Sequence, residues 1–400
     1  MSQQPEDKLR QRFVVTAVLA LVCVGLFFLR YVWADGGTKE HLLRMGANYG
    51  PRVTSGEWYR LLASAFLHGD GLHLFANMLA LWSFGPVLEA LFGPRRYLVL
   101  YGASALVGSL ASAFLTDPRM SVGASGAVWG LMTAGIAIVY RPQGLVPESV
   151  LASARQRAWA PLAINLMYSF KPGVDFLAHL GGGAVGAALV LSGALIGGLR
   201  PLAAGPFSRR GGRGESPLWT GLAIVTALAM AGSVAAGFVI GKPWEASQPV
   251  TFERVPVGET GVTVEMPKAV SRGKIDPQGD SKFHVFGDTA LDPIVIDVLV
   301  SPLEGPIPAE ELEGELEALR KAFAEKMLDD ATRSAEPRVE AVGPHRVVVD
   351  EMKLKNGVAV KRYALIVGAR FVLLRSYEVG DRPKSWADVE QKIVASVAGQ

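Results

Sequence analysis

Long hydrophobic runs separated by short polar segments fill the first 245 residues, whereas residues 250–400 carry short apolar stretches among charged residues. A helix needs about 20 mainly apolar residues to cross a bilayer. Runs of roughly that kind lie at residues 13–34, 72–92, 97–116, 124–140, 157–170, 174–199 and 217–240. The fifth run is short and has polar ends. The first run is longer than the apolar part of a signal peptide, so we expect it to be an uncleaved span. The pattern predicts a polytopic α-helical membrane protein.

The C-terminal part predicts a separate α+β soluble domain. Runs rich in β-branched residues, most of them alternating, predict strands at residues 261–266, 282–287, 293–300, 345–354, 359–367 and 370–379. An acidic amphipathic helix is expected around 308–329 and a terminal helix over 385–397. With its last strand followed by a helix, this part resembles the small antiparallel-sheet modules of the PsbP/Mog1 type.

Basic residues between the apolar runs predict the orientation. They gather before span one, after span two and in the loops after spans four and six, at Lys8, Arg10, Arg12, Arg95, Arg96, Arg141, Arg155, Arg157, Arg200, Arg209, Arg210 and Arg213. If every run crosses, these lie on one side, which the positive-inside rule makes cytoplasmic. The predicted organisation is a cytoplasmic N-terminus (1–12), a membrane core (13–200), a cytoplasmic loop (201–216), a seventh helix (217–240), a linker (241–250) and an extracytoplasmic domain (251–400).

The composition mainly excludes certain functions and kinds of site. Half of the residues are hydrophobic and the net charge is only +3, so nothing indicates nucleic-acid binding. The single cysteine, Cys23, lies in an apolar run, which excludes intramolecular disulfides and cysteine-based metal sites. We expect no metal and no organic cofactor.

Four strongly polar side chains lie inside the predicted spans, where such groups are costly and raise a functional question by default. His73 and Asn77 lie on one helix face at the start of span two. Ser125 opens span four, and His179 lies near the start of span six. Since spans two, four and six all enter from the outer side, the four side chains share one shallow depth.

Small residues can bring spans four and six together. They recur at every fourth position, as Gly126 and Gly130 on span four and as Ala178, Gly182 and Gly186 on span six. Such faces let helix backbones approach closely in lipid. If the two faces meet, Ser125 and His179 come within hydrogen-bonding reach, about 3 Å.

A serine beside a neutral imidazole is an activated nucleophile, because the histidine takes the hydroxyl proton during carbonyl attack and returns it to the leaving amine. Backbone N–H groups at the start of span four, with the side chains of His73 and Asn77, suit a developing oxyanion. Asp175 is expected to point toward the outer loop, so a dyad is favoured over a triad. A single polar residue within a span more often makes a hydrogen bond between packed helices than takes part in catalysis. The occurrence of all four together favours catalysis.

Three sequence blocks together resemble the rhomboid intramembrane serine proteases. They are GEWYRLLASAFLHGDGLHLFANMLALWSFG (56–85), GASG (123–126) and AHLGGGAVG (178–186), in the order and spacing of that family. The resemblance implies a six-helix rhomboid core, to which the seventh span and the C-terminal domain are additions. It implies that Ser125 is the nucleophile and His179 the base. The implied oxyanion donors are the side chains of His73 and Asn77 and the backbone N–H groups of Ser125 and Ala124.

Two positions depart from the family pattern. The Trp-Arg element of the first outer loop appears here as Trp58-Tyr59-Arg60, which leaves the role of Arg60 open. Trp129 stands one turn after the serine, where family members often have a tyrosine that stacks against the histidine ring. The other residues implied in the substrate pocket or in helix packing are Gly123, Gly126, Gly182 and Gly186.

The expected function is that of an intramembrane serine endopeptidase acting on single-pass transmembrane proteins in the lipid bilayer. The alternative is a catalytically inactive rhomboid-like protein that binds membrane clients, but such relatives typically lack the serine or the histidine. A transporter would show inverted repeats, and none is evident. We expect the C-terminal domain to recruit substrates or to bind another envelope protein, and the architecture favours a bacterial inner membrane.

Overall fold

A computed structural model gives two compact units, residues 1–37 with 41–246 and residues 38–40 with 247–400. It describes residues 13–33, 39–116, 119–142, 144–146, 148–157, 159–171, 173–197, 199, 216–244, 251–267, 276–277, 282–286, 294–355, 357–378, 386 and 388–399. The predicted N-terminus (1–12), almost all of the loop 201–216 and most of the linker 241–250 lie outside these residues.

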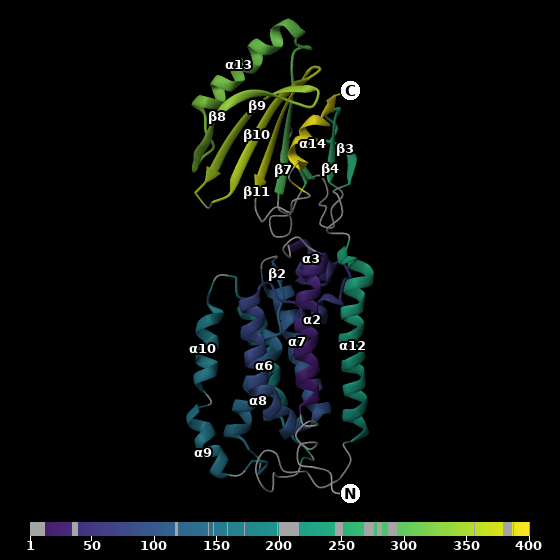
Figure 1. The fold of residues 1–400 in the computed structure, drawn as a ribbon, viewed down its shortest axis with the longest axis vertical. Coiled ribbons are helices and arrows are strands. Elements are labelled where there is room, and N and C mark those ends of the chain that lie inside the picture. Colours follow the sequence, from purple (N-terminus) through teal and green to yellow (C-terminus); the bar gives the residue numbers. More distant parts are fainter. Residues whose placement is uncertain are drawn as a thin grey trace. The chain divides into compact units, whose positions relative to one another are not determined.

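The first unit is a bundle of helices (Figure 1). Its main helices are α2 (Val14–Trp33), α6 (Gly71–Phe92), α7 (Pro94–Leu115), α8 (Ser125–Tyr140), α10 (Trp159–Ser169), α11 (Phe176–Leu191) and α12 (Pro217–Gly241). The shorter elements are α3 (Lys39–Arg44), β1 (Asn48–Tyr49), α4 (Gly50–Thr54), α5 (Arg60–Ala63), the 3-10 helix η1 (Ser64–Phe66), β2 (Met120–Ser121) and α9 (Glu148–Arg157). β1 and β2 pair with each other antiparallel.

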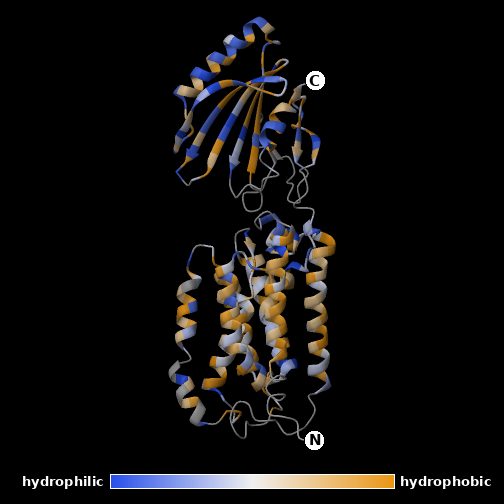
Figure 2. Cartoon of the chain, viewed as in Figure 1, coloured by the Kyte–Doolittle hydropathy of each residue, from blue (hydrophilic) through white to orange (hydrophobic). Residues whose placement is uncertain are grey.

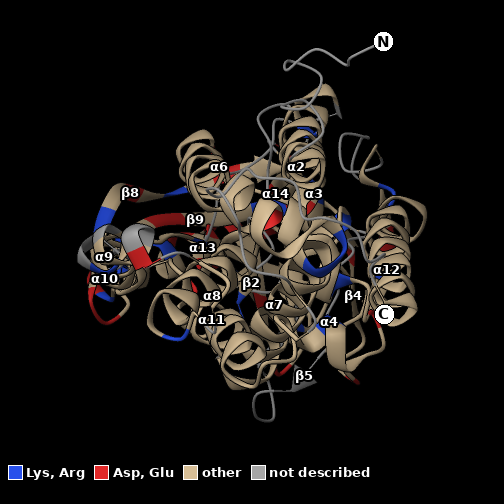
Figure 3. Cartoon of the chain, turned by 90° about the horizontal axis from the view of Figure 1, so that it is seen from below, with Lys and Arg blue, Asp and Glu red and all other residues tan. Residues whose placement is uncertain are grey.

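Four of these helices, α2, α6, α7 and α12, are long and apolar enough to cross a membrane, and α8 and α11 are shorter apolar helices. Apolar residues run along the bundle (Figure 2), and charged residues are scarce on it when it is seen end-on (Figure 3). The predicted fifth span is α10, whose 11 residues rise only about 16 Å, less than a bilayer core. The chain is a multi-pass membrane protein, although α10 by itself is too short to cross.

Two buried charged side chains of the bundle, Glu89 and Arg30, bond to backbone groups near helix ends. The carboxylate of Glu89, which is 2% exposed, accepts hydrogen bonds from the backbone N–H groups of Val15 and Thr16 at 3.0 and 2.9 Å. These first-turn donors of α2 have no acceptor within their own helix. At the other end of α2, the guanidinium of Arg30 donates to the carbonyl of His68 at 2.9 Å. One end of α2 is therefore fixed to Glu89 near the end of α6, and the other to the loop just before α6.

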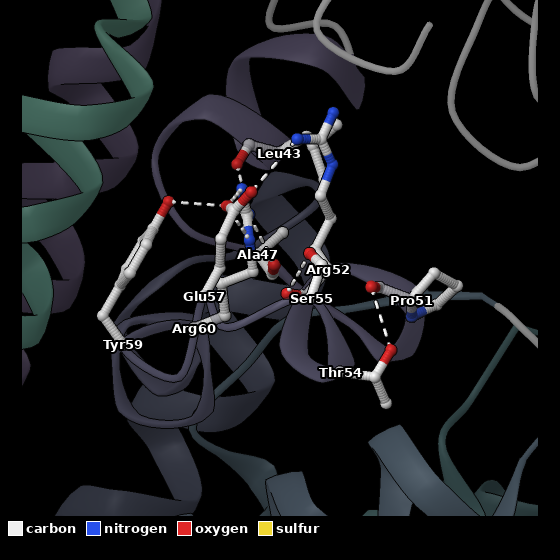
Figure 4. A network of polar contacts seen from close by, with 9 residues as sticks. All are labelled: Leu43, Ala47, Pro51, Arg52, Thr54, Ser55, Glu57, Tyr59 and Arg60. Carbon is white, nitrogen blue, oxygen red and sulfur yellow. Dashed lines mark hydrogen bonds and ion pairs between the residues drawn. The ribbon is translucent and has the colours of Figure 1, made fainter. Parts of the chain in front are cut away.

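The loop between α2 and α6 is organised around the side chain of Arg60, which is 1% exposed (Figure 4). Its guanidinium donates to the carbonyls of Leu43 and Ala47 at 2.5 and 3.0 Å. It also forms an ion pair with the carboxylate of Glu57 at 2.5 Å. Arg60 thus ties α3 and the turn after it to α5, so the residue whose role the sequence left open is the centre of this loop.

The last helix of the bundle, α12, touches the core near both of its ends. A Cβ on Gly237 would overlap the carbonyl oxygen of Met45, so only glycine allows this approach to the first loop. Near the other end, the guanidinium of Arg96 lies over the ring of Trp219, 4.9 Å from its centroid. The additional helix is therefore packed against the bundle and not merely tethered to it.

The second unit contains a seven-stranded antiparallel sheet of order β5-β6-β7-β11-β10-β9-β8. Its strands are β5 (Asp276–Pro277), β6 (Lys282–Phe286), β7 (Ile294–Pro302), β8 (Ala331–Val342), β9 (His345–Leu354), β10 (Ala359–Val367) and β11 (Arg370–Glu378). A smaller sheet of order β12-β4-β3 is formed by β3 (Phe252–Pro256), β4 (Val262–Pro267) and β12 (Ala398–Gly399). The helices are α13 (Ala309–Glu325) and α14 (Val389–Ala395).

Each face of the large sheet has its own core, because side chains alternate along a strand. On one face, residues of β7, β9, β10 and β11 pack with β4 and α14. On the other, Leu316 and Phe323 of α13 pack on Val348 and Ala364. The predicted α+β character of this part agrees with these elements, whereas its likeness to PsbP/Mog1 modules stays a prediction.

Candidate active site

Ser125 is the first residue of α8, and the turn before it requires a glycine. Gly123 has a φ of +127°, which residues with a Cβ rarely adopt. A Cβ at this position would lie 2.8 Å from Nε2 of His73 and 3.8 Å from the hydroxyl oxygen of Ser125. The His73 ring and the Ser125 hydroxyl therefore flank the same bare stretch of backbone.

His73 and Asn77 lie one turn apart at the start of α6. The carboxylate of Asp70 caps this helix and accepts from the backbone N–H of His73 at 2.8 Å. The side-chain amide of Asn77, a residue that is 6% exposed, donates one N–H to the carbonyl of His73 at 2.9 Å. An amide has two N–H groups, so the second remains for another acceptor.

His179 lies in the first turn of α11 and is 5% exposed. Its imidazole stacks on the indole of Trp129, with ring centroids 5.2 Å apart and an angle of 13° between the planes. Trp129 is one helical turn after Ser125 on α8. The stack therefore fixes the plane of the imidazole against the helix that Ser125 begins.

Glycines bring α8 and α11 into backbone contact. A Cβ on Gly182 would overlap the carbonyl oxygen of Gly126, and a Cβ on Gly186 would overlap that of Gly130. No side chain fits between the helices at these levels, as in other close helix pairs within membranes. The two small-residue faces meet, so the helices that carry Ser125 and His179 are direct neighbours.

Asp175, the N-cap of α11, is occupied by partners other than His179. Its carboxylate accepts from the backbone N–H of Ala178 at 3.1 Å, from the guanidinium of Arg119 at 3.0 Å and from the hydroxyl of Ser112. Across the described residues, no carboxylate forms a hydrogen bond with the His179 ring. An Asp–His–Ser triad is therefore not present in this arrangement.

Ser125 and His179 are not hydrogen-bonded to each other within the part of the chain that the structure describes. Such bonds often tighten only when substrate is bound. A small pocket with room for about one water molecule adjoins the serine. Its lining includes Ser64, Ser109, Ser121, Gly123 and Ala178.

Two neighbours of the site were not assigned to it from the sequence. The ring of His68 packs edge-on against that of His73, with centroids 5.2 Å apart. The hydroxyl of Ser169, at the end of α10, lies 2.6 Å from Nδ1 of His179. Neither residue stands out by its spacing in the sequence, because its position next to the site depends on how loops and short helices fold back onto the bundle. Among the residues described, no three His, Cys, Asp or Glu side chains converge as metal ligands do.

The sequence matches the Rhomboid domain family over residues 55–195. Rhomboid protease GluP of Bacillus subtilis (strain 168) is 34% identical over 158 residues, which cover 39% of this chain and 30% of that protein. Rhomboid protease AarA of Providencia stuartii is 28% identical over 205 residues, or 46% of this chain and 73% of the relative. The putative rhomboid protease YdcA of Bacillus subtilis (strain 168) is 31% identical over 178 residues, or 42% of this chain and 82% of the relative.

The matched region contains α6, α7, α8, α10 and α11, and with them all four polar residues of the site. This chain spans less than a third of GluP but most of AarA and YdcA. The family expected from the three sequence blocks is confirmed, and the chain belongs to the rhomboid family.

Proposed function

We propose that this protein is an intramembrane serine endopeptidase that cleaves membrane-protein substrates with a dyad of Ser125 and His179. One observation carries the proposal: α8 and α11 are in backbone contact at Gly126 and Gly182, just inside the points where these helices present the serine and the histidine. Relatives named rhomboid proteases support this class of activity.

In the proposed reaction, the hydroxyl oxygen of Ser125 forms a bond to the scissile carbonyl carbon while the His179 imidazole takes the hydroxyl proton. The carbonyl π electrons move onto oxygen. The imidazolium then gives the proton to the leaving amine as the C–N bond breaks, which leaves an acyl-enzyme. A water molecule then attacks the acyl carbon while the same imidazole takes a proton from it. The imidazolium returns this proton to the Ser125 oxygen as the ester bond breaks, which releases the acid product and regenerates the serine.

The oxyanion formed in this step needs donors that are already in place. We assign this role to the His73 ring, the second amide N–H of Asn77 and the backbone N–H groups of Ser125 and Ala124. The position of the His73 ring over Gly123 supports this assignment, as do the first-turn N–H groups of α8, which have no intrahelical acceptor. One such donor is commonly worth about 3–4 kcal/mol of transition-state stabilisation.

The substrates proposed are single-pass transmembrane proteins. A membrane helix has its amides paired internally, so it must unwind locally before a serine can reach a carbonyl. We therefore expect helix-weakening residues near the cleaved bond. The pocket lined by Ser64 and Ser109 could supply the hydrolytic water beside Ser125.

The alternative is an inactive family member that binds membrane clients. Both Ser125 and His179 are present, and Trp129 stacks on the histidine and fixes the plane of its ring. These features favour activity.

We also propose an orientation: the N-terminus is cytoplasmic, and residues 251–400 lie outside the cytoplasm, on a bacterial inner membrane. The distribution of Lys and Arg among the short loops supports this. The C-terminal domain would then select substrates or bind an envelope protein. If deletion of residues 246–400 leaves the turnover of a model substrate unchanged but alters which substrates are cleaved, the domain acts in selection.

The test of the proposed activity is cleavage of a model single-pass substrate by the full-length protein in proteoliposomes. We expect cleavage by the wild type and none by Ser125→Ala or His179→Ala. Cleavage that persists in purified Ser125→Ala would rule out the proposed nucleophile, and a well-folded wild type that cleaves nothing but binds the substrate would favour the inactive alternative.

A further inference from the structure

Ser169 is the residue whose side chain lies beside Nδ1 of His179. It is the last residue of α10, it is 2% exposed, and its hydroxyl oxygen lies 2.6 Å from Nδ1 of His179. The proposed base is itself 5% exposed, so water does not compete freely for this contact. A buried hydroxyl therefore contacts Nδ1 of the histidine, the nitrogen to which the carboxylate of a triad bonds.

The hydrogen bonds of Ser169 assign the proton between the two atoms. A serine has one O–H donor and two lone pairs. Its O–H donates to the carbonyl of Asn165, one turn earlier in α10, at 2.7 Å. Since the only proton is used there, the hydroxyl oxygen accepts from His179, and Nδ1 is the nitrogen that carries hydrogen.

This assignment sets the chemistry of the other ring nitrogen. A neutral imidazole carries one N–H, so a protonated Nδ1 leaves a free lone pair on Nε2. A general base needs such a lone pair. Stacking on Trp129 fixes the ring plane but leaves the ring free to turn within it. The bond to Ser169 selects one orientation in that plane.

We propose that Ser169 is a positioning residue that holds His179 as the Nδ1–H tautomer and presents Nε2 as the base toward Ser125. This inference rests on the proposed dyad. The same oxygen accepts from the imidazolium that forms during attack, and hydrogen bonds to charged donors are stronger than those to neutral ones. Asp175 does not take this role, because its carboxylate is engaged by Arg119 and Ser112.

The variants that test this are Ser169→Ala, Ser169→Thr and a matched control, Ser83→Ala. Ser83 makes the same back-bond, to the carbonyl of Leu79 at 2.7 Å, but lies exposed on α6. We expect Ser169→Ala to lower kcat about 10-fold or more at unchanged KM, as loss of a hydrogen bond to a charged group does. Ser169→Thr, which retains a hydroxyl that can bond in the same way, should restore most of the rate, and Ser83→Ala should behave as wild type.

The rate at which a small fluorophosphonate labels Ser125 should fall in parallel with kcat, because it depends on the base and not on substrate docking. Two kinetic results would overturn the inference: a Ser169→Ala enzyme with the wild-type kcat, or a Ser169→Thr enzyme as slow as Ser169→Ala.

A spectroscopic measurement on the wild type does not depend on whether a Ser169 variant folds. The ¹⁵N spectrum of histidine-labelled wild type, with His179 assigned by comparison with His179→Ala, should show a protonated Nδ1 and an unprotonated Nε2. A protonated Nε2 would overturn the inference. Because this readout does not require turnover, it tests the proposed tautomer of His179 even if the wild type cleaves no substrate and the proposed activity fails.

Discussion

Trp129 and His179 stack face to face across the contact between α8 and α11, with ring centroids 5.2 Å apart and planes within 13° of parallel. The indole nitrogen of Trp129 is buried and has no hydrogen-bond partner among the described residues. Trp129 therefore acts on the histidine through its ring face and not through its polar edge. Loss of an aromatic face should disturb the site even where bulk is kept.

Replacing Trp129 by leucine should accordingly lower kcat, while Trp129→Tyr and Trp129→Phe should stay close to the wild-type rate. Aromatic pairs are worth about 0.5–1.5 kcal/mol beyond the area they bury, which sets the expected loss at up to about 10-fold. Cleavage of a model substrate measures it. A leucine variant as active as the phenylalanine variant would show that the stack has no part in catalysis.

Gly182→Ala should separate α8 from α11 and lower both stability and activity. Its Cβ would overlap the carbonyl oxygen of Gly126, and overpacking of this kind commonly costs about 1–3 kcal/mol. Gly135→Ala is the matched control, because it lies on α8 and its Cβ would come no closer than 4.0 Å to the Leu88 side chain. Thermal unfolding in detergent should shift only for Gly182→Ala; equal shifts would contradict the close contact.

The first loop should weaken in acid through Glu57. Burial raises the pKa of this carboxyl, but the guanidinium groups of Arg60 and Arg52 outweigh that effect and hold the pKa below its ordinary value of 4.5. A depressed folded-state pKa contributes stability above about pH 4.5 that is lost as the pH falls through the folded pKa. Glu57→Gln should lack this acid-dependent loss, whereas Glu148→Gln, from an exposed pair with Arg155, should retain it.

Unfolding midpoints measured between pH 7 and pH 3 test this. If wild type and Glu57→Gln lose stability in parallel across that range, the pairing of Glu57 with Arg60 does not stabilise the loop.

The C-terminal unit contains a buried ion pair that should be sensitive to truncation. Asp350 is 0% exposed and accepts from Nε of Arg362 at 3.0 Å. Asp350→Ala should cost the unit about 3–5 kcal/mol, because it leaves a buried guanidinium without its partner. Glu313→Ala, which breaks the exposed pair with Arg346, should change nothing measurable. The two variants are compared by the protease resistance of this unit, measured in the full-length protein at increasing urea concentrations. Similar urea midpoints for the two variants would refute the expected difference.

Elements with a strong and regular apolar pattern could be predicted from the sequence. The first span, expected over 13–34, is α2 at Val14–Trp33, and the strand expected over 345–354 is β9. β8 (Ala331–Val342) was not predicted, because it is an edge strand paired only with β9. Edge strands carry charges and proline to discourage further pairing, so β8 shows no apolar alternation.

The residues of the candidate site also divide into those that the sequence could predict and those that it could not. Spacing alone placed His73, Asn77, Ser125 and His179 at helix starts, because helical periodicity is local. It could not place Ser169, since the contact with His179 depends on where α10 ends and how the chain turns back into α11. A serine near the end of a short apolar run has no distinguishing pattern, and only the folded chain shows what it touches.

Covalent labelling of Ser125 by a serine-directed fluorophosphonate, on the full-length protein in membranes, tests the proposed dyad most directly. The wild type should be modified at Ser125, and both Ser125→Ala and His179→Ala should remain unlabelled. Labelling of His179→Ala at the wild-type rate, or modification of a different serine, would contradict the central claim.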